Sequence, residues 1–307
     1  MKNQKIIISG PTGVGKTNIA VDLCQKINGE IISADSRQVY KYLDIGTNKE
    51  GILEKDNIRK INGIPQYLTD IIAPDKKYNA KNFEQDAEKY EKNILKENKT
   101  PVIVGGTGLY IKSFLYGLDD LPDADEAIRS SIQKDIDEKG LEYVYGMLAE
   151  ADIFSAQKNK GNTQRIIRAL EVYKLTGKTM TELLNRKKIK NKKYKHFVII
   201  KDREELYRDI NERCIRMLKS GMIEETERIL NMGYAKNSYA LTGVGYKHII
   251  KYLDNEITKQ ELTEHFSRDT RQYVKRQITW FKNQQDTELI DITGKNYKSV
   301  TEIILRH

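Results

Sequence analysis

The chain has 307 residues, enough for one large domain or for a core domain with an insertion. Its formal net charge of +9 and its pI of about 9.1 favour a polyanionic partner such as nucleic acid, although a merely lysine-rich surface is the alternative. The two cysteines, Cys24 and Cys214, match no metal-binding spacing and indicate a reducing compartment. No apolar run reaches about 18 residues and the N-terminus leads straight into a strand, so we expect a cytoplasmic enzyme without membrane span or signal peptide.

A glycine-rich loop follows the first predicted strand. Residues 6–8 predict a buried strand, residues 18–27 predict a helix, and the sequence GPTGVGKT lies between them at residues 10–17. Gly, four residues, then Gly-Lys-Thr is the phosphate-loop pattern, in which backbone N–H groups surround an anion. Lys16 would supply charge to a phosphate, and Thr17 would offer a hydroxyl to Mg²⁺ at a helix N-terminus. A plain glycine-rich turn is the alternative, and the motif does not identify the phosphorylated ligand.

An acid ends the second predicted strand, residues 29–35. Ligands of open α/β sheets bind beyond the carboxyl ends of the strands, so Asp35 is expected beside the phosphate loop. A carboxylate there would hold Mg²⁺ or accept a proton. The alternative is an N-cap for the following turn.

The third predicted strand, residues 100–104, is preceded by a charged amphipathic helix over 79–98 and followed by Gly-Gly-Thr at 105–107. Strands alternating with helices predict an α/β fold, a P-loop NTPase-like doubly wound parallel sheet. This strand lacks the terminal Asp that many ATP-hydrolysing proteins use for Mg²⁺, which counts against an ordinary ATPase.

The rest of the chain reads as mainly helical. We expect a P-loop core of residues 1–118 plus about 196–307, with a helical insertion domain of about 119–195. A strand is predicted at 196–200, and the basic run 186–195 is either a solvated loop or a phosphate contact. Apolar periodicity predicts helices over the following residues: 126–150, 162–175, 179–185, 203–231 with a break near Gly221, and 261–282.

The last predicted helix carries a basic stripe. Spacings of three and four place Arg268, Arg271 and Lys275 on one side of it. Basic residues near an aromatic side chain, here Trp280, suit a nucleic-acid groove. A solvated, salt-bridged face is the alternative.

Together these motifs resemble the tRNA dimethylallyltransferases, also called the tRNA isopentenyltransferase family. The resemblance extends over nearly the whole chain, in the order of the family. It is carried by these segments: GPTGVGKT (10–17), ISADSRQVYKYLDIGTNK (32–49), VGGTGLYIKSFLYGL (104–118), QRIIRALEVYKLTGKT (164–179), GVGYKHI (243–249) and TRQYVKRQITWFK (270–282).

The resemblance implies transfer of the dimethylallyl group from dimethylallyl diphosphate to an adenine amine in tRNA, with release of diphosphate. The adenine is the one adjacent to the anticodon on its 3′ side, and the cofactor is Mg²⁺. Asp35 would be the general base, Thr107 would lie beside the flipped adenine, and Lys16 would assist catalysis. Thr17 and Asp35 are the implied metal ligands. The implied diphosphate-binding residues are Gly10, Pro11, Thr12, Gly13, Val14, Gly15, Lys16, Thr17 and Arg213.

The resemblance also implies a partner, the anticodon stem-loop of tRNA, bound by a monomer without membrane contact. The implied tRNA-binding residues are Asp35, Ser36, Arg37, Gln38, Thr107, Arg129, Gln164, Arg165, Ile166, Ile167, Arg168, Thr242, Gly245, Tyr246, Lys247, Lys275, Arg276, Gln277, Trp280 and Lys282. Two stretches depart from the family pattern: 158–162 lacks a His-Pro-x-Asp element, and 242–243 is Thr-Gly where many members have Arg or Ile.

Two other functions fit parts of the sequence. An ATP-dependent P-loop kinase of a nucleotide or small molecule would account for the phosphate loop. An RNA-binding module with a vestigial phosphate site would account for the basic helices. The missing acid after the third strand and the basic C-terminal half favour prenyl transfer over the kinase.

Overall fold

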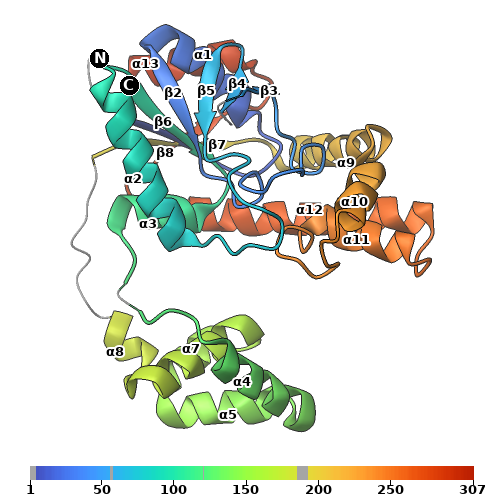
Figure 1. Cartoon of the computed structure of the whole chain (residues 1–307). Coiled ribbons are helices and arrows are strands. Elements are labelled where there is room, and N and C mark those ends of the chain that lie inside the picture. The colour runs from blue at the N-terminus through green and yellow to red at the C-terminus, as the bar shows by residue number, and fades with distance from the viewer. Residues whose placement is uncertain (1–4, 56–57, 120, 185–192) are drawn as a thin grey trace. The chain divides into compact units, whose positions relative to one another are not determined.

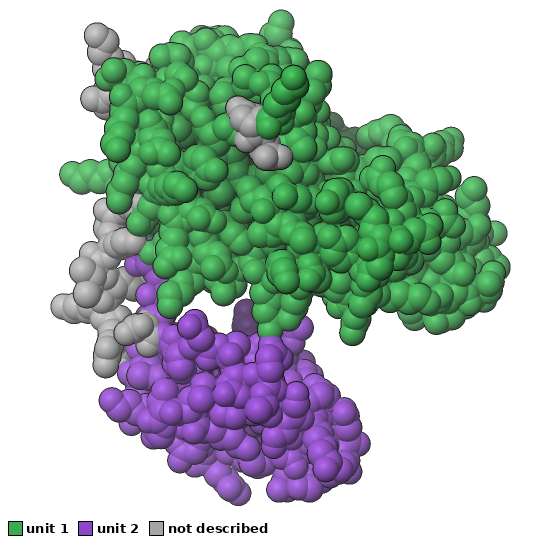
Figure 2. Space-filling view, viewed as in Figure 1, with its two compact units in different colours: residues 1–115, 192–307 green, residues 116–191 purple. Residues whose placement is uncertain are grey.

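The structure is a computed structural model that describes residues 5–55, 58–119, 121–184 and 193–307. The chain divides into two compact units (Figure 2). The core unit consists of residues 1–115 and 192–307, and the helical unit consists of residues 116–191. Within the described residues, none of the helices combines the length and apolar character needed to cross a bilayer.

The core unit is built on a sheet whose strands are ordered β3-β4-β5-β2-β6-β1-β7-β8 (Figure 1). Pairing is parallel from β5 to β8 and antiparallel at the β3-β4-β5 edge. The predicted doubly wound parallel sheet is therefore confirmed, with an antiparallel edge that was not predicted. The strands are β1 Ile6–Ser9, β2 Gly29–Ser33, β3 Ile52–Leu53, β4 Arg59–Ile61, β5 Ile64–Tyr67, β6 Thr100–Gly105, β7 Lys195–Ile200 and β8 Glu288–Asp291.

The three central strands are buried along their whole length or nearly so, which explains their continuous runs of Ile and Val. Their register aligns their carboxyl ends: Ser9 on β1 pairs with Gly105 on β6, and Ser33 on β2 pairs with Val104. The segments that follow β1, β2 and β6 therefore leave the sheet at one edge. This places the phosphate loop, Asp35 and the Gly-Gly-Thr segment together.

Helices cover the sheet and extend beyond it (Figure 1). The break predicted near Gly221 is confirmed, since this residue has φ 101° and separates α9 from α10. The elements α11, α13 and β8 were not predicted. The helices of the core unit are α1 Lys16–Ile27, α2 Ala80–Lys96, α3 Gly108–Tyr116, α9 Arg203–Lys219, α10 Met222–Asn231, α11 Val244–Leu253, α12 Lys259–Lys282 and α13 Tyr297–Arg306.

The helical unit has its own core, which includes Ile132, Val144, Leu148, Ile166 and Leu170. The prediction of one helix over 126–150 was wrong, because Gly140 has φ 85° and separates two helices. Of the basic run 186–195, residues 186–192 lie outside the described residues. The helices are α4 Glu126–Lys139, α5 Leu141–Ala151, α6 Ile153–Asn159, α7 Thr163–Thr176 and α8 Met180–Leu184.

Candidate active site

The phosphate loop connects β1 to α1 in a conformation that requires glycine. Gly10 has φ 140°, and a Cβ there would lie 2.3 Å from the carbonyl oxygen of Ile199 on β7. Gly15 has φ 75° and is the N-cap of α1. No residue with a side chain could occupy either position without strain. The glycines of the phosphate-loop pattern are therefore required by the backbone conformation of the loop.

Lys16 is the first residue of α1, and its Nζ donates a 2.7 Å hydrogen bond to the carbonyl oxygen of Pro11. Burial lowers the pKa of Lys16 to about 8, the charge of Asp35 opposes this decrease, and the charge of Arg213 adds to it. The three residues line the same cavity. The pKa of this ammonium therefore lies close to neutral pH.

These groups line a cavity of about 90 Å³ at the carboxyl edge of the sheet. Arg213 comes from α9, and burial lowers its pKa. Within the described residues, neither Lys16 nor Arg213 has an ion-pair partner within 4 Å. The cavity is a site for an anion. Its lining consists of Thr12, Gly13, Gly15, Lys16, Thr17, Asn18, Ile31, Ser33, Asp35, Gln38, Thr47, Asn48, Glu50, Gln66, Val104, Gly105, Gly106 and Arg213.

Asp35 follows β2, where it both forms a turn and lies at the cavity. Its Oδ1 accepts hydrogen bonds from the backbone N–H groups of Arg37 (2.8 Å) and Gln38 (3.3 Å), which forms a turn. Its carboxylate also lines the cavity. The Thr107 hydroxyl accepts a 3.0 Å hydrogen bond from the N–H of Ser36, so the segment after β6 is joined to the segment after β2.

Gln38 has a structural role that was not predicted. Its Nε2 donates to the carbonyl oxygens of Thr47 (3.2 Å) and Asn48 (3.3 Å). Its Oε1 accepts from Ser33 and Gln66. This side chain supports the wall of the cavity that it also lines, and its contact with tRNA stays a prediction.

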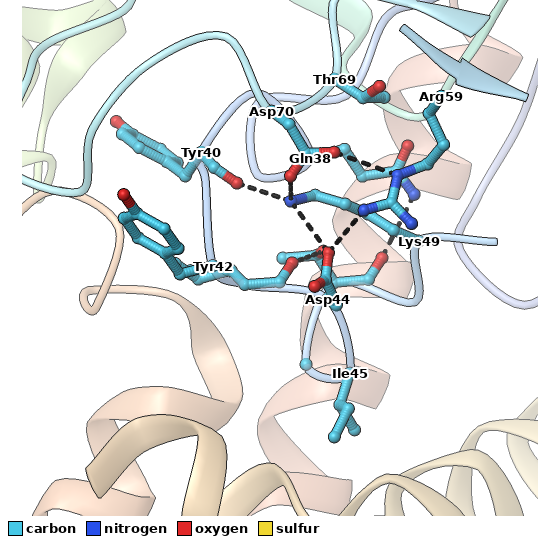
Figure 3. A network of polar contacts seen from close by, with 12 residues as sticks. Gln38, Tyr40, Tyr42, Asp44, Ile45, Lys49, Arg59, Thr69 and Asp70 are labelled. Carbon is cyan, nitrogen blue, oxygen red and sulfur yellow. Dashed lines mark hydrogen bonds and ion pairs between the residues drawn. The ribbon is translucent and has the colours of Figure 1, made fainter. Parts of the chain in front are cut away.

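The segment 44–50, which contributes to that wall, is held by a network of charges that the sequence reasoning missed (Figure 3). Lys49 and Arg59 both pair with the buried Asp70, at 2.5 and 3.0 Å, and Arg59 also pairs with Asp44 at 2.7 Å. The side chain of Lys49 is fully buried. Charged side chains are rarely buried unless they are paired, and here each cation has an acid partner.

Glu225 on α10 holds the start of the same segment. It is 3% exposed, and its carboxylate accepts the backbone N–H groups of Asp44, Ile45 and Gly46 at 2.7 to 3.0 Å. It also accepts the hydroxyl of Tyr246 at 2.7 Å. The burial of this acid on α10 depends on partners distant in sequence, so the sequence alone gave no signal for its role.

The predicted tRNA-binding residues of the core unit fall into two groups. Lys275, Arg276 and Lys282 are exposed on α12, and Lys247 is exposed but paired with Asp269 at 2.7 Å. Thr242 is also exposed, and its hydroxyl lies 3.4 Å from a guanidinium nitrogen of Arg37. By contrast, three of the predicted contacts are buried in this structure, and their contact with tRNA stays a prediction: Gly245, Tyr246 and Gln277.

One of the partly covered residues is Trp280. Its ring packs against Gly108, where a Cβ would lie 2.4 Å from ring atoms, so this side chain helps to fix the start of α3.

In the helical unit, Gln164 and Arg165 are exposed, Ile167 is partly buried, and Ile166 is fully buried and reassigned to the core. Arg129 and Arg168 both bind the fully buried Glu171, at 2.8 and 2.5 Å. Burial raises the pKa of Glu171, but the hydrogen bonds from the two arginines outweigh this effect and the pKa is lowered. The contact of these residues with tRNA stays a prediction.

The donor set of the cavity suits a hard cation. The hydroxyl of Thr17 and the carboxylate of Asp35 both line it, as does Glu50. Among the described residues, no group of three or more His, Cys, Asp or Glu side chains is placed to hold a metal ion. A few oxygen ligands completed by water and substrate phosphates are typical of Mg²⁺ rather than of zinc.

The sheet order, the phosphate loop and the cavity at the carboxyl edge define a P-loop α/β protein. The family model described as IPP transferase matches residues 38–284. The tRNA dimethylallyltransferase of Endomicrobium trichonymphae is 51% identical over 287 residues, which cover 93% of this chain and 94% of that protein. The corresponding protein of Clostridioides difficile is 42% identical, with 97% and 94% covered.

Solved structures agree. The full-length tRNA isopentenylpyrophosphate transferase from Bacillus halodurans has a TM-score of 0.70 and 31% identity, with 99% of this chain and 95% of that chain covered. A eukaryotic dimethylallyltransferase acting on tRNA has a TM-score of 0.77 and 28% identity, with 95% and 74% covered. The chain belongs to the IPP transferase family, and the resemblance seen in the sequence is confirmed.

Proposed function

We propose that this protein transfers a dimethylallyl group from dimethylallyl diphosphate to the exocyclic amine of the adenine 3′-adjacent to the anticodon in tRNA. A bond forms between the amine nitrogen and the allylic carbon, the bond from that carbon to the diphosphate oxygen breaks, and the amine loses a proton. The observation that carries the proposal is the cavity, in which Lys16, Arg213 and Asp35 meet. The relatives whose printed names include tRNA dimethylallyltransferase support both the reaction and the acceptor.

The phosphate loop and its cations bind the leaving group. Negative charge grows on the diphosphate as the carbon–oxygen bond breaks, and an allylic carbon tolerates the positive charge left on it. Within the described part of the chain, no acid lies within 4 Å of the charged nitrogens of Lys16 or Arg213, so their charge is available to the diphosphate. Stabilising charge that develops in the transition state is the effective way to lower a barrier.

Asp35 is the general base. The exocyclic amine of adenine is a poor nucleophile because its lone pair is delocalised into the ring, so removal of its proton assists attack. The turn hydrogen bonds to Arg37 and Gln38 hold this carboxylate in place at the cavity. The Thr107 hydroxyl accepts a hydrogen bond from the N–H of Ser36, the residue after Asp35. This hydroxyl would lie beside the adenine.

Thr17 and Asp35 are the proposed ligands of a divalent ion, with Mg²⁺ the best match to their oxygen donors. When bound, the ion would neutralise charge on the diphosphate. Lys16 and the loop N–H groups would orient the diphosphate.

The acceptor base must leave its stack to reach the cavity, which costs a few kcal/mol. An anticodon loop reduces this cost because its bases are already single-stranded. Exposed basic residues such as Lys275 and Arg276 would supply affinity through the tRNA phosphates. Cytoplasmic location and a monomeric state remain predictions.

Turnover with labelled dimethylallyl diphosphate and unmodified tRNA, compared with labelled ATP and the same tRNA, tests the proposal. We expect label from the prenyl donor in tRNA and none from ATP. Phosphorylation without prenyl transfer would restore the kinase, which membership of this family does not favour. Binding of tRNA without either reaction would favour the RNA-binding module.

A further inference from the structure

Gln277 lies on α12, inside the segment predicted to bind tRNA, yet its side chain faces the core unit. It is 7% exposed. Its Oε1 accepts a 3.0 Å hydrogen bond from the backbone N–H of Thr12, and its Nε2 donates a 2.9 Å hydrogen bond to the carbonyl oxygen of Gly106. A backbone N–H must donate and a carbonyl must accept, so only this orientation of the amide satisfies both partners.

The contact to Thr12 reaches the catalytic lysine through a single peptide unit. The N–H of Thr12 and the carbonyl of Pro11 belong to the same planar peptide. The N–H donates to Gln277, and the carbonyl oxygen accepts from Lys16 Nζ at 2.7 Å. The side chain of Gln277 therefore fixes the plane whose other end holds the ammonium of Lys16.

The contact to Gly106 is equally constrained. A Cβ at Gly106 would lie 2.6 Å from Gln277 Nε2 and 3.3 Å from the carbonyl oxygen of Gly10. The glutamine amide, the start of the phosphate loop and the Gly-Gly-Thr segment thus pack without space for one more carbon atom. Both Gly106 and Thr12 line the anion cavity, whereas Gln277 does not.

We propose that Gln277 is a positioning residue: its amide joins the phosphate loop to the Gly106 segment and thereby sets the position of Lys16 at the diphosphate site. The inference rests on the proposed function and deepens it. This role is offered in place of the predicted role in tRNA binding, because the oxygen and the nitrogen of the amide both form hydrogen bonds within the core unit. An amide is needed because no other uncharged side chain of this length supplies one acceptor and one donor.

Binding of inorganic diphosphate with Mg²⁺, measured by calorimetry without tRNA, tests the role directly. Gln277→Met keeps the volume and removes both hydrogen bonds, and we expect the Kd to rise about tenfold, because small displacements of positioned groups have large effects. Gln272→Met is the matched control, since Gln272 is exposed on the same helix, and its Kd should equal that of the wild type. Thermal unfolding of both variants checks that they are folded.

In the transfer assay, the KM for the prenyl donor should rise in Gln277→Met while the KM for tRNA changes less than twofold. A rise in the tRNA KM with unchanged diphosphate affinity would overturn the positioning role and restore direct tRNA contact. Wild-type protein that binds diphosphate but transfers no prenyl group would contradict the proposed function alone.

A double-mutant cycle that combines Gln277→Met with Gly106→Ala offers a second test. The alanine methyl would displace the glutamine amide, so both changes act on one contact. We expect the double variant to bind diphosphate no more weakly than whichever single variant has the larger loss of affinity. Losses that multiply would show that the two residues act independently, against the proposal.

Discussion

The cavity of the core unit and the interior of the helical unit each contain two buried or half-buried cations, but the surroundings of these cations differ. In the core unit, Lys16 and Arg213 line a cavity and have no acid within ion-pair distance among the residues described. In the helical unit, Arg129 and Arg168 form ion pairs with Glu171, whose side chain is fully buried. One arrangement leaves positive charge available to a ligand, whereas the other neutralises it within the protein.

This difference separates binding sites from structural ion pairs. A cation without a partner in a low-dielectric cavity reduces stability, and such a cost persists where function requires it. Paired charges need no such explanation. We therefore infer a structural role for these ion pairs, in which Arg129 joins α4 to Glu171 on α7 and Arg168 binds the same acid within α7.

The largest expected effect concerns the acid beside these cations. Asp35→Asn keeps a side-chain acceptor for the turn at Arg37 but removes the base, so we expect transfer to fall at least about 100-fold. Binding of tRNA should fall less than tenfold. Steady-state kinetics and filter binding measure the two quantities, and an equal loss in both would mean that Asp35 is structural.

Lys16→Met tests the free cation of the core unit. We expect diphosphate affinity to fall about 100-fold, in line with the loss of a charge-assisted contact of about 3 kcal/mol. The unfolding temperature should rise at neutral pH, because an ammonium whose pKa is lowered from 10.5 to about 8 destabilises the fold below pH 10.5, with the full effect below about pH 8. Unchanged stability together with unchanged affinity would place Lys16 outside the binding site.

The pH dependence sharpens the same point. Because the pKa of Lys16 is lowered to about 8, its charge is complete below that pH and is lost above it. Diphosphate affinity should therefore weaken as the pH rises through about 8 to 9. Lys16→Arg should bind diphosphate without this transition, and calorimetry over that range decides between the two outcomes.

Glu171→Ala tests the paired cations of the helical unit. Removing the acid takes a buried carboxylate partner away from both arginines, and we expect a loss of about 3 kcal/mol in the stability of that unit. The pKa of Glu171 is lowered in the fold, so its contribution is present above its ordinary value of 4.5 and is lost as the pH falls below it. Hydrogen exchange of α4 and α7 would report the change, and unaltered protection would contradict the structural role.

The smallest effect is expected at the surface. Lys275→Ala removes an exposed cation from α12, and tRNA affinity should fall a few-fold, with the slope of log affinity against log salt reduced by about one. Lys251→Ala, an exposed lysine of α11, is the control. Unchanged slopes in both variants would remove this face of α12 from the tRNA interface.

The sequence was most informative where chemistry dictates residue type. The phosphate loop was predictable because Gly10 and Gly15 occupy backbone conformations that only glycine adopts readily. Asp35 was predictable as a cavity residue because parallel strands place their carboxyl ends at one edge. The break at Gly221 was predictable for the same reason, since this residue also has a positive φ that glycine adopts readily.

Other features depend on tertiary contacts that have no local signature. The exposed strand Ile52–Leu53 is too short to show alternation, and its pairing follows from the hairpin beside it. The roles of Glu225 and Lys49 arise from partners distant in sequence, and polar residues are expected at the surface from composition alone. Gln277 was assigned to tRNA from its neighbours in the motif, although the helix turns it inward.

Mass spectrometry of tRNA offers the most direct test of the central claim, that a phosphate loop and one aspartate here serve prenyl transfer. The gene would be expressed in a bacterial strain that lacks its own enzyme, beside the Asp35→Asn variant. We predict a prenylated adenosine on the 3′ side of the anticodon with the wild type and an unmodified adenosine with the variant. Unmodified tRNA with both proteins, when both are present and folded, would contradict the account.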